Sequence, residues 1–197
     1  MIVAANAFAL ALAWWQRWPI ELLLVSYWLQ SAVIAWYGRR RILAIRRFVY
    51  GKTCYDLDAP GDEHARGEML KQSIVKSAAG IALFYHAVVF VMLVILLQVH
   101  GTRVTLPDLL GIAAAGAAFL YTHRASFLRN LENDRSGEPP IRTLMFLSLQ
   151  RVLPMHLIMV FGLGLGYGGA MFLFGALKTI ADVAMHRVER RLLAGRG

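Results

Sequence analysis

The sequence predicts an all-α fold, a polytopic membrane bundle of about six transmembrane helices with both termini in the cytoplasm. Hydrophobic residues make up 58% of the 197 residues and charged residues only 17%, and the mean hydropathy is +0.52. A soluble domain is roughly half apolar and about a quarter charged. The apolar residues also stand in blocks close to the ~20 residues that cross a bilayer as a helix. Basic residues gather beside particular blocks, as they do in membrane proteins.

Each apolar block is interpreted as one crossing, because a helix that is apolar on all sides needs lipid or protein around it. The predicted spans are 1–15, 19–38, 74–98, 106–127, 141–165 and 169–192. The polar segments 39–73 and 128–141 contain turn-forming residues and are predicted to be cytoplasmic loops. The first block lacks the basic start of a cleavable signal, so it is interpreted as a retained span. The whole chain is then a single transmembrane domain.

The last apolar block has two interpretations. It runs from Val152 to Leu177 and is interrupted by Pro154, His156 and the glycine-rich patch "GLGLGYGG". One long span would place the C-terminal arginines on the opposite side from the basic segment 39–52. Two spans joined by a turn at the glycines keep every basic cluster on the cytoplasmic side, which agrees with the positive-inside rule. We therefore predict six spans, with five as the alternative.

Charge and cysteine content limit the partners. The net charge is +9, and the basic clusters at span ends favour contact with anionic membrane lipids. No basic stripe interleaved with aromatic residues is present, so nucleic acid is not an expected partner. The single cysteine, Cys54, excludes an intrachain disulfide and a multi-cysteine zinc cluster. A homo-oligomer is left open.

Ionisable residues inside predicted spans indicate where chemistry is to be sought, since they are costly in lipid and usually paired or functional. Asp182 and His186 are four residues apart and share one helix face. His156 and His86 are predicted at overlapping depths. Imidazoles and a carboxylate suit Zn²⁺ or non-haem iron. We therefore predict a metal site formed by His86, His156, Asp182 and His186, with Lys178 as a catalytic residue that holds a substrate headgroup or tunes Asp182.

Each of these residues also has a purely structural interpretation. Lys178 is four residues before Asp182, and an ion pair between them would neutralise the carboxylate without a metal. His186 and His123 each precede an arginine and fit the end of a span at the membrane interface. A lone histidine such as His86 can simply hydrogen-bond a neighbouring helix.

Three stretches resemble the motifs of a bacterial integral-membrane family known only as a domain of unknown function. They are "SYWLQSAVIAWYGRRRIL", "RVLPMHLIMVFG" and "LKTIADVAMHRVER", and the resemblance covers Asn6 to Glu189. It implies a protein of the bacterial inner membrane and singles out His156, Asp182 and His186 without assigning them an activity. The family is associated with an acidic residue where Gln30 stands here, which implies that a charge at this position is dispensable.

Four functions follow as hypotheses. The leading one is a membrane metalloenzyme in which zinc or iron activates water or oxygen toward a lipid or other apolar substrate. The alternative is a small transporter or channel in which His86, His156, Asp182 and Lys178 form a proton or ion relay. A haem-binding electron carrier with His86 and His156 as axial ligands is a third. The fourth is a non-catalytic membrane scaffold.

Overall fold

The computed structural model describes residues 2–150 and, further along, residues 169, 172, 173, 175–177, 179–181, 183, 184 and 187, which we call the C-terminal helical positions. The chain is mostly helical, as the sequence predicts, with one added β-hairpin. The elements are α1 (Ile2–Trp15), α2 (Ile20–Ala44), β1 (Arg47–Tyr50), β2 (Thr53–Asp56), α3 (Asp62–Val99), α4 (Leu106–Ser136) and α5 (Ile141–Gln150).

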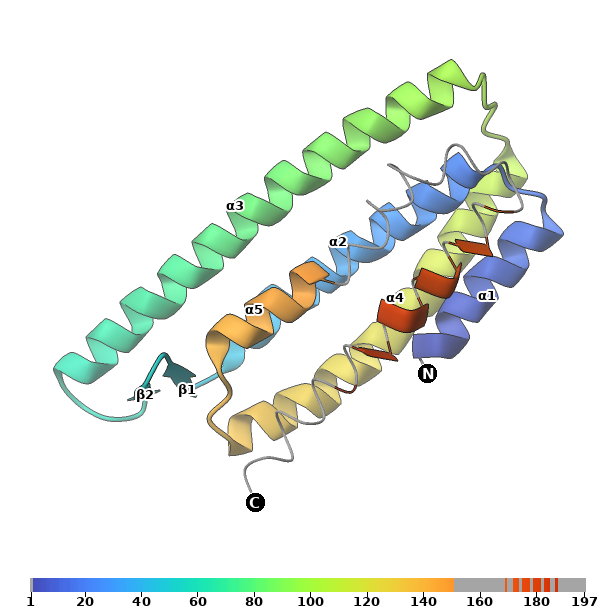
Figure 1. Ribbon diagram of the computed structural model, residues 1–197. Coiled ribbons are helices and arrows are strands. Elements are labelled where there is room, and N and C mark those ends of the chain that lie inside the picture. Colours follow the sequence, from blue (N-terminus) through green and yellow to red (C-terminus); the bar gives the residue numbers. More distant parts are fainter. Residues whose placement is uncertain are drawn as a thin grey trace.

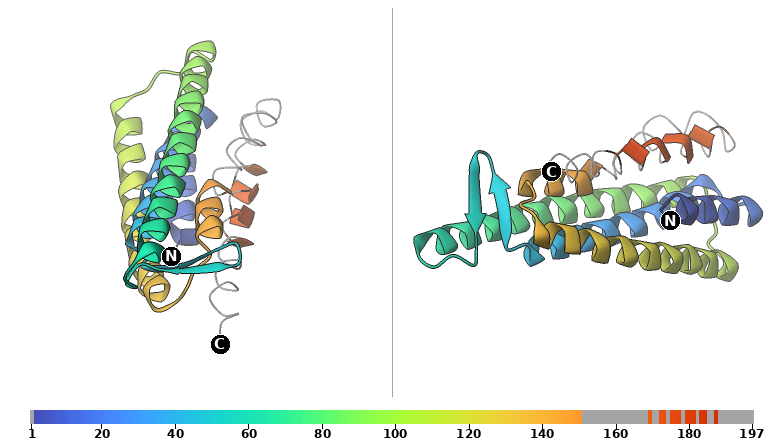
Figure 2. Two further views of the ribbon diagram at one scale, coloured as in Figure 1. Left: turned by 90° about the vertical axis from the view of Figure 1, so that its left-hand side faces the viewer. Right: turned by 90° about the horizontal axis from the view of Figure 1, so that it is seen from below.

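Helix α2 is the centre of the bundle. It packs against α3, α4 and α5, while α1 packs against α4. Figures 1 and 2 show these long helices side by side, with the β-hairpin at the end of α2 farthest from α1. Contacts between residues 21 and 100 at one end and 45 and 71 at the other make α3 antiparallel to α2. The C-terminal helical positions lie against α1, where a Cβ on Gly175 would be 3.2 Å from Leu10.

Local signals explain where the helices begin and end. Helix α4 begins with a capping box in which the Thr105 side chain and the Asp108 side chain each bond the other residue's backbone N–H, which satisfies two free donors of the first turn. Helix α3 is followed by Gly101, whose φ of 60° lies in the left-handed region that favours glycine. Pro19 precedes α2 and ends the short turn from α1.

Two apolar clusters hold the bundle together. The upper cluster lies at the end of the bundle where α2 begins. It joins α1, α2, α3 and α4 and includes Trp18, Leu23, Leu93 and Ile112. The lower cluster joins the end of α2, the hairpin, α3 and α5, and its fully buried members are Ile45, Phe48, Leu57 and Ile141. The buried polar residues described below lie between these two clusters.

Helices α2 and α3 are each long and apolar enough to cross a membrane. Only 17% of the most apolar stretch of α3 is buried, and its exposed residues include Leu83, Phe84 and Phe90. Such a stretch is mostly buried in the core helix of a soluble protein, whereas in α3 it is mostly exposed. An apolar surface of this extent requires lipid or another protein surface around it.

The predicted loops contain more regular structure than expected. Within 39–73, α2 continues to Ala44, a hairpin occupies 47–56 and α3 begins at Asp62; within 128–141, α4 continues to Ser136. Apolar content marks the part of a helix that suits lipid, whereas a helix can extend beyond the lipid with charged residues on its surface. The hairpin turns at Gly51, whose φ is 65°, and its four-residue strands are too short for a clear alternating pattern.

Gly111 on α4 is expected to tolerate no side chain. A Cβ there would lie 2.6 Å from the ring of the fully buried Trp18 and 2.6 Å from the Gln16 amide oxygen. Gly111→Ala is therefore expected to lower the free energy of unfolding by about 1–3 kcal/mol. Gly116→Ala on the same helix, where nothing lies within 4 Å, should stabilise by up to about 1 kcal/mol. Reversible unfolding in SDS and detergent mixtures measures both, and equal effects would contradict the packing argument.

Candidate functional site

His86 lies near the middle of the apolar part of α3. It is ten residues after Lys76 and fourteen before His100, which places it ~15 Å and ~21 Å from these residues along the helix axis. The neighbouring face of α2 supplies Trp28, whose indole N–H donates to the His86 carbonyl oxygen at 3.1 Å. The Trp28 ring also packs against Phe90, with ring centres 5.4 Å apart. Helix α2 therefore holds the backbone of α3 at His86 in a defined position.

Both ring nitrogens of His86 have hydrogen-bond partners. Nδ1 lies 2.7 Å from the carbonyl oxygen of Ala82, one turn earlier on α3. Nε2 lies 2.9 Å from the hydroxyl oxygen of Ser31 on α2. The Ser31 hydroxyl in turn lies 2.7 Å from the carbonyl oxygen of Trp28, to which it donates. The imidazole is thus the centre of a chain of three contacts between α3 and α2.

Neutral His86 and Ser31 together carry too few protons to form all three hydrogen bonds. A carbonyl oxygen only accepts, so the contacts with Ala82 and Trp28 each need a proton from the histidine or from Ser31. The neutral imidazole carries one N–H and the hydroxyl one O–H, which makes two protons for three hydrogen bonds. The imidazolium carries two N–H groups and completes the chain. The geometry is therefore that of a site that gains a hydrogen bond when it binds a proton.

Several polar residues of α2 and α4 are buried at about the depth of His86. Helices α2 and α4 run in the same direction, because Trp18 meets Gly111 at one end and Arg41 meets Asp134 at the other. In each pair the second residue stands 93 positions after the first in the sequence. The same offset places His123 of α4 level with Gln30 of α2. On α2, Ser26, Gln30 and Ser31 are buried, and on α4, Thr122 and His123 are buried.

His123 is buried within the bundle, and its interfacial interpretation stays a prediction. It is 5% exposed and its ring centre lies 4.1 Å from that of Phe119. The sequence places it near the end of the fourth span, but α4 continues to Ser136, so its backbone position is well inside the helix. The arginine that follows it is exposed on another face. Its depth could not be judged from apolar content alone.

At the end of α3 that follows the apolar stretch, a histidine contacts a buried carboxylate. The Glu21 side chain is 4% exposed, and its carboxylate contacts Nδ1 of His100. His100 from the end of α3 covers this carboxylate. This residue pair joins the start of α2 to the end of α3.

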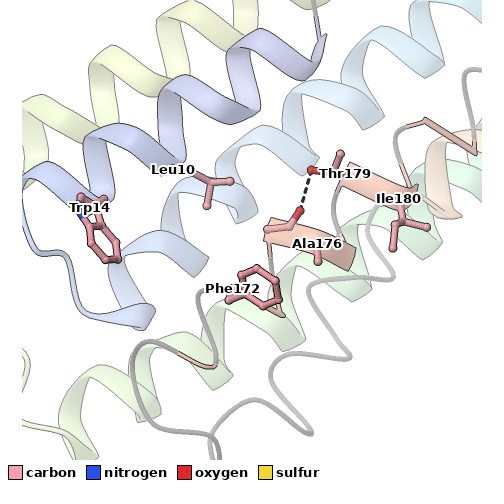
Figure 3. Close-up of a pocket in the computed structure, with 7 residues that line it drawn as sticks. Leu10, Trp14, Phe172, Ala176, Thr179 and Ile180 are labelled. Atoms are coloured by element: carbon pink, nitrogen blue, oxygen red, sulfur yellow. Dashed lines mark hydrogen bonds between the residues drawn. The ribbon is translucent and has the colours of Figure 1, made fainter.

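An open cleft of about 540 Å³ lies between α1 and the C-terminal helical positions. Figure 3 shows Leu10 and Trp14 on one side and Phe172, Ala176 and Ile180 on the other. The Thr179 hydroxyl donates to the carbonyl oxygen of Gly175 at 2.7 Å and is thereby engaged within its own helix. The lining is almost entirely apolar, so the cleft offers little for polar or acid–base chemistry.

The predicted metal site lies mostly outside the described residues. His156, Asp182, His186 and the predicted catalytic Lys178 are not among them, and His86 is. Within the described part of the chain, no group of three or more His, Cys, Asp or Glu residues is placed to hold a metal ion. A metal at Nε2 of His86 would have to replace Ser31. The metalloenzyme stays a prediction, for which elemental analysis should find about one transition metal per chain.

The geometry defines a class of protein: an α-helical bundle with two helices long and apolar enough to span a membrane and with buried polar residues on α2 and α4. A family model, described as a family of unknown function (DUF6498), matches residues 1–196. The chain belongs to this family. Neither the curated proteins nor the solved structures contain a significant match.

Proposed function

We propose that this protein is a small transporter or channel of the bacterial inner membrane that moves protons, alone or coupled to a solute, with His86 as its proton-binding residue. The observation that carries the proposal is the hydrogen-bond chain of His86, which is one proton short when the imidazole is neutral. In this proposal the chain forms the six-span bundle that the sequence predicts. The predicted relay residues His156, Asp182 and Lys178 would continue the path.

Protonation of His86 would have two opposing effects on the free energy of the site. Protonation completes the third hydrogen bond, and a hydrogen bond to a charged group contributes about 1.5–3 kcal/mol. The charge must also be held away from water, which costs free energy when no carboxylate compensates.

The Ser31 hydroxyl can hydrogen-bond His86 in both of its protonation states. When neutral His86 carries its proton on Nδ1, Nε2 can only accept, and the hydroxyl must turn from the Trp28 carbonyl to donate to it. When Nε2 is protonated, the hydroxyl accepts from the ring and turns back to the carbonyl. The two protonation states would thus differ in the direction of one O–H bond.

Replacing His86 with glutamine is expected to abolish proton flux. Glutamine fills a similar space and can hydrogen-bond Ser31, but its amide does not bind a proton near neutral pH. In proteoliposomes with a potassium diffusion potential and an internal pH-sensitive dye, we expect His86→Gln to lower the flux by at least about a hundredfold, the usual range for loss of an acid–base group.

The matched control is His64→Gln, the same substitution on the same helix. His64 lies in the first turn of α3, with Nδ1 2.6 Å from the carbonyl oxygen of Leu57, outside the apolar stretch. Its variant should retain wild-type flux. Flux that is absent from the wild-type protein, or that survives His86→Gln in a folded and monodisperse preparation, would exclude the proposed function.

Cys54 tests the proposed orientation. It is the one cysteine of the chain and it is exposed on β2, within the segment predicted to be cytoplasmic. A membrane-impermeant maleimide should label it in inverted inner-membrane vesicles and not in intact spheroplasts. Partial burial, and then a hydrogen bond and the charge of Glu138, raise the pKa of the thiol. Labelling should therefore accelerate about tenfold per pH unit above neutrality, because the thiolate is the reactive form. Labelling of intact spheroplasts would reverse the orientation.

A further inference from the structure

Two side chains of α2 have buried polar atoms that the described residues leave unsatisfied. Ser26 and Gln30 are four residues apart, so they lie one above the other on the same helix face. Each is 1% exposed. The Ser26 hydroxyl oxygen and both the oxygen and the nitrogen of the Gln30 amide have no hydrogen-bond partner among the residues that the structure describes.

The unsatisfied hydroxyl of Ser26 differs from those of Ser31 and Thr122, which are also buried in helices. A buried serine or threonine in a helix normally donates to a carbonyl oxygen one turn earlier. Ser31 donates in this way to Trp28, and Thr122 donates to Ala118 at 2.8 Å. Ser26 makes no such contact, so its hydroxyl remains available for a molecule beside Gln30.

The free-energy cost of burying the polar atoms of Ser26 and Gln30 without partners indicates that a bound molecule satisfies them. A buried polar group without a partner costs about 1–3 kcal/mol, and here three such atoms lie within one turn of one helix. An apolar side chain of similar shape at position 30 would carry no such cost. Glutamine at this buried position is therefore explained if a bound molecule satisfies its amide.

We infer that Ser26 and Gln30 form a water-binding site inside the bundle, between α2 and the neighbouring α4. The amide presents both donors and an acceptor, and the hydroxyl presents both. A cation would leave the amide N–H groups without an acceptor, and an anion would be repelled by the amide oxygen. Water satisfies both kinds of group, which is the usual role of a buried water.

The register of α2 and α4 places His123 level with this site, and Gln30 immediately precedes Ser31, the partner of His86. Bound water here would hydrate the buried polar residues at about the depth of the His86 chain. The inference does not rest on proton movement by His86, because it follows from the unsatisfied atoms of Ser26 and Gln30 alone.

Cysteine accessibility tests the site. In a Cys54→Ser background, which has no other cysteine, Gln30→Cys and Leu24→Cys are reacted with 2-aminoethyl methanethiosulfonate. Leu24 is the matched control, because it is on the same helix, similar in size and 0% exposed. Gln30→Cys should react at least about tenfold faster, since a thiol in a dry apolar site is inert. Equal rates in the two variants would overturn the inference.

A measurement on the wild-type protein covers the case in which Gln30→Cys does not fold. In water-edited solid-state NMR of the protein in bilayers, the Gln30 side-chain amide should receive magnetisation from water about as fast as the exposed amides of the hairpin. An amide that receives none, or that proves to be bonded to another side chain instead, would overturn the inference. Neither measurement depends on proton flux. The water site can therefore be disproved while the proposed role of His86 stands, and the role of His86 can be disproved while the water site stands.

Discussion

Arg41→Met is expected to lower the free energy of unfolding by about 3–5 kcal/mol, the typical cost of removing one partner of a buried ion pair. The Asp134 side chain is 0% exposed and that of Arg41 is 12% exposed. The guanidinium contacts both carboxylate oxygens, with Nη2 2.9 Å from Oδ1 and Nε paired with Oδ2. This bidentate pair joins the end of α2 to the end of α4, and methionine would leave the carboxylate buried and uncompensated.

Arg46 provides the control for this prediction. It forms a comparable pair with Asp58, with two guanidinium contacts at 2.9 and 3.0 Å, but both side chains are more than half exposed. Arg46→Met is expected to cost about 0–1 kcal/mol, because solvent screens an exposed pair. Reversible unfolding in SDS and detergent mixtures compares the two variants. A loss of stability as large in Arg46→Met as in Arg41→Met would show that burial does not determine the effect.

Lys71→Met is expected to cost about 2–4 kcal/mol, because hydrogen bonds from a charged group contribute about 1.5–3 kcal/mol. The Lys71 side chain is 3% exposed, and Nζ lies 3.0 Å from the Glu68 carboxylate. The same ammonium lies 3.3 Å and 3.4 Å from the carbonyl oxygens of Ile45 and Leu43, where α2 ends. Lys71 thus caps α2 from the side of α3 and fixes the lower end of both helices.

Lys76→Met is the matched variant on the same helix. Lys76 is exposed, so its loss should change the free energy of unfolding by no more than about 0.5 kcal/mol. Unfolding curves of the two variants under the same conditions check this difference. If Lys71→Met unfolds like the wild type, the contacts of the Lys71 ammonium with the carbonyl oxygens of Leu43 and Ile45 do not stabilise the end of α2.

The sequence predicts a helix where residues within that same segment, such as an apolar block, indicate it. Apolar blocks indicate α2, α3 and α4, and the predicted start of the fourth span at 106 coincides with the start of α4 at Leu106. The lower ends of α2 and α4 were missed, because they continue as charged helices beyond the apolar blocks. The hairpin was missed as well, because two four-residue strands carry too little pattern.

The candidate site was predicted in part. An ionisable group in an apolar span is costly, which marks His86 as a candidate, and a hydrogen bond to a neighbouring helix is one interpretation of it. Its pairing with Ser31, 55 positions away, could not be derived, since no local pattern relates the two residues. The same is true of Glu21 with His100. The burial of Gln30 and Ser26 depends on which face of α2 meets α4, and one polar residue in an apolar span does not indicate that face.

The sequence by itself determined that this chain forms long apolar helices with basic clusters beside them, since composition and block length act on each segment separately. It also determined that ionisable residues stand within those helices. Only the tertiary structure decided which of these residues meet. The register of α2 against α3 and α4 is set by packing of side chains distant in the sequence, and this register brings Ser31 to His86 and Arg41 to Asp134.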